Sequence, residues 1–402
     1  MSHTAEKNYP ISWILLLAFL TALGPLSIDM YLPALPQMAH DLHTTQQKVA
    51  NSLPAYFFGL AVGQLIYGPI SDRIGRKTPL YFGLSLYILG CLLCVYATSD
   101  WTLIAARVIQ ALGGCVGVVI ARAAIRDRLD VEGSAQAFSS MMIVMGIAPV
   151  VAPTLGAWIL AFFSWHSIFK LLALIGLICL CSVHFFFKET LALEKRLHLN
   201  VKQIFLLYGN ILQDKHFVLP MLCGCLGGGA LFAYINSATA ILMGQYHLSQ
   251  QQFAYVFGLN ALGITLMSWV NKHSVAYLSV FQRLLLGGLI QIVGTVLLLI
   301  AGYFEHFPLW VIMCGMFAVV SSIGLSGPNA MALAMAQQGA RAGTASAIMG
   351  SMQFMVGLLG GVLLNFLFGT ALLNMAIVML LSSGGALLAM YGTSNNNRMQ
   401  KK

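Results

Sequence analysis

The sequence predicts an all-α membrane protein that crosses the bilayer with twelve helices. Of its 402 residues, 59% are hydrophobic and only 8% are charged, whereas a soluble domain carries about 25% charged residues. The mean hydropathy is +0.83, and apolar segments of about 20 residues, long enough to span a bilayer, recur along the whole chain. The twelve expected spans cover residues 11–34, 48–70, 78–97, 101–123, 135–161, 165–187, 216–242, 250–271, 282–303, 307–334, 342–366 and 369–391.

The positive charge is concentrated between the apolar segments. The formal net charge is +9, and most basic residues, such as Arg73, Arg126 and Lys188, fall in gaps on one side of the membrane. The positive-inside rule makes this side the cytoplasm and places both termini there, in agreement with an even number of spans. Because membrane orientation explains the charge, we expect no nucleic-acid partner.

One long polar connection divides the spans six and six. We expect residues 1–187 to form an N-terminal six-helix bundle, residues 188–215 a cytoplasmic linker, and residues 216–402 a C-terminal six-helix bundle. A linker of this kind lets two bundles move relative to one another, as in transporters built from repeats. A plain loop within a rigid bundle is the alternative.

No motif predicts a metal site or a catalytic centre. All eight cysteines lie inside apolar segments, where we expect small, reduced and buried side chains. Cys91 and Cys94 have the spacing of metal ligands but lack a second pair and a nearby histidine. Because the external loops are too short for a catalytic site, we expect neither an enzyme nor a cofactor.

Two ionisable side chains inside the spans are candidates for proton coupling. Asp29 lies in the first span and Arg107 in the fourth, and each costs about 2.5–3.5 kcal/mol at the membrane centre. Arginine stays protonated in proteins, whereas Asp29 can gain and lose a proton. Burial favours the neutral carboxyl and a nearby cation the ionised one, so a movement that changes either would switch Asp29. The alternative is a structural ion pair that locks two helices.

Aromatic and uncharged polar side chains in the spans predict a cavity for an amphipathic neutral solute. Such a solute is held by ring contacts and a few hydrogen bonds. For each aromatic side chain, packing against lipid or another helix is the alternative. The expected lining residues are Asp29, Tyr31, Tyr56, Phe232, Tyr234, Asn236, Phe257, Asn260 and Gln353.

Three motifs together resemble the major facilitator superfamily. GPISDRIGRKTPL, residues 68–80, resembles the loop signature between helices two and three of that family, and RVIQALGG resembles its fourth-helix motif, with Arg107 as the motif arginine. MGIAPVVAPTLG is similar to the fifth-helix motif of antiporters. LSIDMYLPALP and ARAAIRD resemble the Bcr/CflA drug-resistance subgroup of twelve-helix drug:proton antiporters. The antiporter motif here consists of Gly146, Pro149, Pro153 and Gly156.

The resemblance implies two six-helix bundles that give alternating access to a central cavity in the bacterial inner membrane. It makes Asp29 the proton-coupling carboxylate and Arg107 its regulator, and it implies a cytoplasmic gate in which Asp72 faces the start of helix eleven near Gly343. The second-half copy of the loop signature, at residues 269–273, is eroded, so only the first-half gate is complete. The expected gate residues are Gly68, Asp72, Arg73, Gly75 and Arg76.

We therefore expect a proton-coupled antiporter that exports small amphipathic drugs, such as phenicol- or bicyclomycin-like antibiotics. The proton gradient would supply the energy without a cofactor or metal. The expected partners are a small-molecule substrate, protons and the lipid bilayer, and the working unit is a monomer. An exporter of a native metabolite, such as an amino acid, peptide or sugar, is the alternative, and uptake stays open because a fold does not fix direction.

Overall fold

The computed structural model describes residues 11–129, 131–196, 201–304, 307–336, 338 and 342–399, and this part of the chain is helical without β-strands. Twelve of the described helices have 19 residues or more, which is the predicted number. They are α1 (Ile11–Asp29), α4 (Ser52–Ile74), α5 (Lys77–Val95), α6 (Asp100–Arg128), α7 (Val131–Phe162), α8 (His166–Phe186), α10 (Lys215–Thr239), α11 (Gln250–Ser274), α12 (Val280–Tyr303), α13 (Leu309–Met335), α14 (Ala342–Leu364) and α15 (Ala371–Met399).

Length and composition suit these helices to a bilayer. Eleven described segments are long and apolar enough to cross a membrane, and α7 adds the apolar stretch Gly146–Phe162. A helix satisfies its backbone N–H and C=O groups internally, which is a requirement in lipid. The predicted all-α membrane fold is therefore confirmed.

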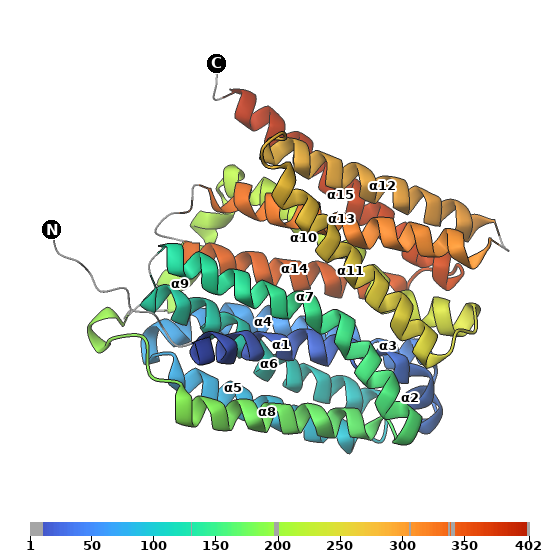
Figure 1. Cartoon of the computed structure of the whole chain (residues 1–402), viewed down its shortest axis with the longest axis horizontal. Coiled ribbons are helices and arrows are strands. Elements are labelled where there is room, and N and C mark those ends of the chain that lie inside the picture. Colours follow the sequence, from blue (N-terminus) through green and yellow to red (C-terminus); the bar gives the residue numbers. More distant parts are fainter. Residues whose placement is uncertain are drawn as a thin grey trace.

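The two halves of the chain lie side by side. In Figure 1, α1 and α4 to α8 group on the lower side and α10 to α15 on the upper side, and contacts of α4 with α14 and of α7 with α11 join the groups. α9 (Val201–Leu212) lies at the left end of this view, and α2 and α3 lie at the right end. We call these the linker end and the opposite end. That the halves act as separate domains stays a prediction.

Small residues set the distance between neighbouring helices. A Cβ atom at Gly113 of α6 would overlap the backbone of Tyr87 in α5, so only glycine permits this approach. Large hydrophobic side chains such as Phe82, Trp158 and Leu388 are exposed on the outside. An extensive apolar exterior of this kind marks a membrane-facing surface.

The cysteines follow the prediction only in part. All eight are free thiols and six are buried, but Cys181 and Cys314 are exposed. The expectation of burial was wrong for these two, because an apolar helix also has a lipid-facing side. Among the described residues, no group of His, Cys, Asp and Glu could hold a metal ion.

Several short elements were not predicted. α1 ends at Asp29 instead of continuing to residue 34, and a 3₁₀-helix (Leu32–Ala34) and α2 (Leu35–Asp41) follow it. α3 (Gln46–Ala50) precedes α4, and α10 continues as a π-helical turn (Ala240–Gln245). The linker segment itself contains a 3₁₀-helix (Leu193–Lys195) and the helix α9, so it is more than a plain polar connection.

Candidate functional site

Asp29 is the last residue of α1 and lies in the core of the molecule. Its exposed fraction is 4%, and its Oδ1 is buried without a hydrogen-bond partner. The backbone next to it is held closely, because a Cβ atom at Gly156 of α7 would overlap the carbonyl oxygen of Met30. Asp29 thus lies where α1 ends and the chain turns into the 3₁₀-helix Leu32–Ala34.

This position disfavours an ionised carboxylate. A buried charge without a partner is costly, and a helix C-terminus carries about half a negative charge, which repels an anion. A protonated carboxyl is tolerated in the same place. The geometry therefore suits a group that holds a proton in this arrangement and releases it in another.

Arg107 is fully buried in α6 and lies against aromatic rings. Its guanidinium carbon lies 4.4 Å from the ring centroid of Tyr31 and 4.1 Å from that of Tyr56. Nη1 donates a hydrogen bond to Oε1 of Gln110 at 2.6 Å, while Nε and Nη2 have no partner. In the described residues, no ion pair joins Arg107 to Asp29. Arg107 is therefore held by cation–π contacts, which are worth about 2 kcal/mol when desolvated. It does not form the ion pair with Asp29 that was the alternative.

On the second half, three of the predicted cavity residues form a cluster near Asp29. Nδ2 of Asn260 donates to the hydroxyl of Tyr234 at 2.9 Å, and the ring of Tyr234 stacks on Phe257 with centroids 5.3 Å apart. Oγ1 of Thr239, also on α10, donates to the backbone carbonyl of Leu32, three residues after Asp29, at 3.3 Å. The segment that follows Asp29 therefore contacts the second half.

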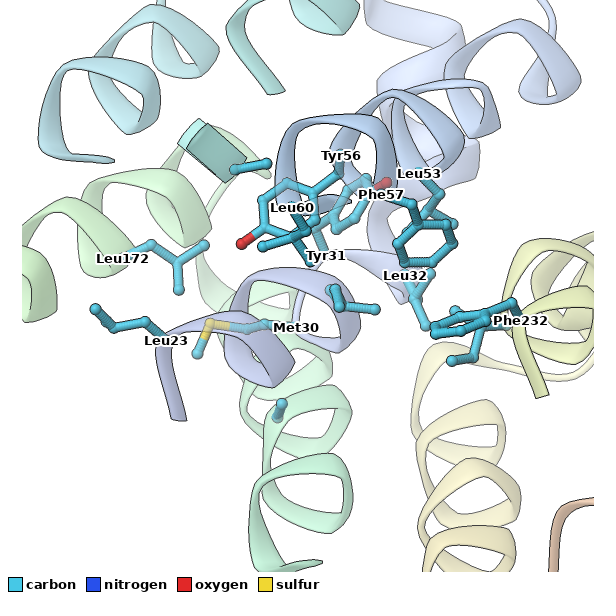
Figure 2. Close-up of a cluster of buried hydrophobic side chains, with 14 of the residues drawn as sticks. Leu23, Met30, Tyr31, Leu32, Leu53, Tyr56, Phe57, Leu60, Leu172 and Phe232 are labelled. Atoms are coloured by element: carbon cyan, nitrogen blue, oxygen red, sulfur yellow. The ribbon is translucent and has the colours of Figure 1, made fainter. Parts of the chain in front are cut away.

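Phe232 belongs to a different contact between the halves. Figure 2 shows its ring beside Phe57 and Leu32, with the ring centroids of Phe57 and Phe232 4.6 Å apart and that of Phe354 5.7 Å from Phe232. Sequence reasoning missed Phe57 and Phe354, because nothing distinguishes them from the many other phenylalanines of the spans.

The remaining predicted cavity residues lie elsewhere. Asn236 bonds to the carbonyl of Phe232 and faces a cavity at the opposite end, and Gln353 is exposed beside Gly228. The structure thus divides the nine predicted lining residues among several places: Tyr31 and Tyr56 around Arg107, Tyr234, Phe257 and Asn260 near Asp29, and Phe232, Asn236 and Gln353 apart from these.

At the linker end, Arg76 holds the predicted gate loop together. It donates to Asp72 at 2.6 Å, to Asp127 at the end of α6 at 2.8 Å, and to Oγ of Ser71 at 2.8 Å. Arg76 is 5% exposed, so its pair with the largely buried Asp127 is shielded from water, whereas Asp72 is partly exposed. The resemblance placed both Asp72 and Arg73 in the gate, but Arg73 is exposed and Arg76 makes the contact with Asp72.

The two gate glycines differ. Gly75 ends α4 with a φ of +98°, in the region that favours glycine, and it leaves room for the carboxylate of Glu189. Gly68 lies inside α4, and a Cβ atom there would meet nothing within 4 Å. The helix continues through Pro69 to Ile74, beyond the expected end of the second span at residue 70.

Glu189 completes this network, and no sequence signal pointed to it. Its carboxylate accepts hydrogen bonds from the backbone N–H groups of Arg76, Lys77, Thr190 and Leu191, at 2.9–3.1 Å. Burial raises the pKa of Glu189, but these backbone donors outweigh it and lower the pKa below its ordinary value. The start of the linker is thereby fixed to the N-terminus of α5.

A cavity of about 320 Å³ lies between the halves beside this network. Asp72, Arg122 and Arg126 of the first half line it together with Gly343 of α14 and Tyr208 of α9. The side chain nearest to Gly343 is that of Arg126, and the carboxylate of Asp72 bonds to Arg76 instead. The predicted partners of the gate therefore share one cavity, but Asp72 makes no hydrogen bond to α14 in the described residues.

The antiporter motif places α7 between the halves. Pro149 and Pro153 lie inside the helix. Gly156 contacts the end of α1, whereas a Cβ atom at Gly146 would lie 3.7 Å from Oγ1 of Thr265 in α11. The motif therefore contacts both the backbone beside Asp29 and the second half.

The sequence model of the Major Facilitator Superfamily matches residues 17–364. The chain belongs to the Major Facilitator Superfamily. Its sequence is 34% identical over 360 residues to an uncharacterized MFS-type transporter, YdgK, of Bacillus subtilis, and the match covers 89% of each chain. It is 29% identical over 356 residues, again 89% of each chain, to a bicyclomycin resistance protein homolog of Haemophilus influenzae. The second match confirms the expected likeness to the Bcr/CflA subgroup.

A solved structure also supports the fold. A D-xylose–proton symporter matches with a TM-score of 0.73 at 14% identity, covering 94% of this chain and 97% of that one. At this identity the likeness shows the fold alone. As a superfamily member with apolar helices throughout, the protein is a multi-pass transporter of the bacterial inner membrane that handles a small molecule.

Proposed function

We propose that this transporter is a proton-coupled antiporter that exports small amphipathic drugs by alternating access. The observation that carries the proposal is the carboxyl of Asp29, buried at the end of α1, next to the segment that contacts the second half, and without a partner for Oδ1. The similarity to the bicyclomycin resistance protein homolog of Haemophilus influenzae supports bicyclomycin-like antibiotics as substrates. Phenicol-like antibiotics are the second candidate class.

In the proposed cycle, Asp29 takes a proton from the outer side and releases it to the cytoplasm while the drug moves outward. Protonation removes the cost of the buried charge and so favours the arrangement described above. Arg107 stays charged throughout and holds Tyr31 and Tyr56 in place. The gate loop around Arg76 and Asp72 closes the linker end, which we assign to the cytoplasm together with both termini.

We further propose that the proton gradient is the energy source, with no cofactor and no enzymatic step, and that a monomer is sufficient. Export of a native metabolite, with drug efflux incidental, is the second candidate. The aromatic and amide groups around Tyr234 and Asn260 support it equally, because they fit any neutral amphipathic solute.

The test replaces Asp29 with Asn in proteoliposomes. We expect the variant to insert and bind bicyclomycin but to lose accumulation driven by an imposed pH gradient. Asp100→Asn is the matched control, because Asp100 lies in the first turn of α6, away from the core. If D29N still concentrates bicyclomycin in proportion to the pH gradient, the coupling role is wrong.

A further inference from the structure

A second cavity lies between the halves at the opposite end. Its volume is about 210 Å³, and residues from both halves line it. Six side-chain amides face it: Gln46, Gln47 and Asn51 from the first half, and Asn236, Asn365 and Asn374 from the second. Of these six, only Asn236 was predicted to contact substrate.

The side chains that line this cavity are of few chemical kinds. The lining contains no ionisable and no aromatic side chain, and the rest is aliphatic or small, as with Pro54 and Leu364. A cation would need a carboxylate or a ring face, and tight binding of an anion would need an arginine or a lysine; none of these lines the cavity. An uncharged solute with its own donors and acceptors fits such a lining best.

Some of the amides are already used. Nδ2 of Asn365 donates to Oδ1 of Asn51 at 2.8 Å, and Nε2 of Gln47 donates to Oδ1 of Asn365 at 3.3 Å. The amide of Asn374 bonds to the backbone of Leu367 and Gly369. Asn365 is therefore a bridge between the halves, and Asn374 holds its own loop.

Other amide atoms are left without partners. A side-chain amide offers two donors and one acceptor, yet Nδ2 of Asn51 and Oδ1 of Asn236 have no hydrogen bond within the described residues, and Nε2 of Gln46 is buried without one. Asn236 is 8% exposed. An unpaired polar group in a buried place is costly, which applies to Nε2 of Gln46. The free donor of Asn51 and the free acceptor of Asn236 line the same cavity, so donors from one half and an acceptor from the other mark a place for a ligand.

We propose that this cavity is a second substrate site, which binds uncharged solutes rich in carbonyl and hydroxyl groups. The inference rests on the proposed export function, since the second cavity would bind the exported solute at the outer end of its path. The volume of about 210 Å³ is smaller than a drug-sized pocket, so the site takes one polar portion of such a solute. A solute that bonds to Asn51 competes with the bridge from Asn365 and so favours separation of the halves at this end.

The test uses bicyclomycin, an uncharged cyclic dipeptide with several hydroxyl groups, as the probe. Asn51→Asp removes the free donors but keeps Oδ1 for Asn365, and Asn236→Ala removes the free acceptor. The exposed Asn210→Ala on α9 is the control. We expect each cavity variant to bind bicyclomycin about 5- to 10-fold more weakly in equilibrium binding to the purified protein, as the loss of one hydrogen bond predicts. Thermal unfolding checks that each variant is folded.

The outcomes separate this inference from the proposed function. An unchanged dissociation constant in both folded cavity variants, or no binding of bicyclomycin to the unmodified protein, overturns the second site. Weaker binding in both variants with no change in N210A supports it. If the unmodified protein binds bicyclomycin through these amides but shows no transport driven by a pH gradient, the site stands and proton-coupled export fails.

Discussion

The position of Asp29 is set by backbone packing and not by a paired charge. No cation pairs with it in the described residues, and what fixes it is the contact between Gly156 and the carbonyl of Met30. Arg107 is separate from it and is enclosed by Tyr31 and Tyr56. The two membrane charges therefore act as one titratable group and one fixed group, each with its own surroundings.

A single methyl group at Gly156 tests this dependence. We expect Gly156→Ala to displace the end of α1 and lower pH-driven transport in proteoliposomes about tenfold or more, because overpacking costs about 1–3 kcal/mol. Gly146→Ala is the matched control in the same helix, since its Cβ atom would lie at an ordinary contact distance of 3.7 Å from Oγ1 of Thr265. Equal transport rates for the two variants would contradict the positioning role of Gly156.

For single residues, the sequence identified the unusual ones but not their contact partners. Asp29 and Arg107 are predictable because charges inside apolar spans are rare and costly. That Arg76 rather than Arg73 binds Asp72 was not predictable, because three basic residues in one turn look alike until the helix end fixes their directions. Phe57 and Phe354 carried no signal, since their role depends on contacts between distant helices.

Among the elements, the linker is the one whose structure differs most from its prediction. Its first residues bind the N-terminus of α5 through Glu189, and its helix α9 packs Leu207, Tyr208 and Ile211 against the second half. The linker therefore contacts both halves at the linker end and lines the cavity between them.

The Glu189 contact predicts a pH dependence. The pKa of Glu189 is lowered in the fold, so its ionised form stabilises the protein fully above the ordinary glutamate pKa of about 4.3. This stabilisation is lost as pH falls from there through the lowered pKa. We expect Glu189→Gln to lower the Tm by about 2–5 °C at pH 7, and the difference from the unmodified protein to vanish at low pH.

Melting curves across pH in detergent measure this difference. Glu194→Gln is the control, because Glu194 lies in the same segment and is exposed. A Tm difference for E189Q that persists unchanged below the glutamate pKa would show that the carboxylate charge is not what matters.

The long helices were predictable because an apolar run of 20 residues has few other solutions in lipid. The short elements were not. α2, α3 and the π-helical turn are only five to seven residues long, too short for a hydrophobic period to distinguish them from loops. α9 has the length of a helix, but its position in a charged segment concealed it.

In the whole molecule, weak polar contacts join the two halves at both ends. At the linker end, the hydroxyl of Tyr208 in α9, the linker helix that packs against the second half, donates to the backbone carbonyl of Leu65 in the first half at 3.1 Å. At the opposite end, Asn365 bridges to Gln47 and Asn51. The sequence could not predict these contacts, because they join residues far apart in the chain. No ion pair joins the halves in the described part of the chain, so the polar contacts at each end are hydrogen bonds, each of modest energy.

Removing one contact should therefore open one end. We expect Tyr208→Phe to favour separation at the linker end and Asn365→Ala separation at the opposite end. Each hydrogen bond contributes about 0.5–1.5 kcal/mol, which corresponds to a population shift of about 2- to 10-fold. Each variant is the control for the other, because both remove one polar contact between the halves and differ only in its position.

Distances between pairs of spin labels, one on each half, measure the two ends independently. Phe186 and Lys272 are exposed at the linker end, and Ser164 and Gln251 are exposed at the opposite end. Tyr208→Phe should lengthen only the first distance and Asn365→Ala only the second. If both variants lengthen the same distance, the ends do not open separately and alternating access in this protein depends on other contacts. If the shifts occur as expected, the arrangements open at the linker end and at the opposite end differ little in free energy. The protonation of Asp29 can then determine which end is open.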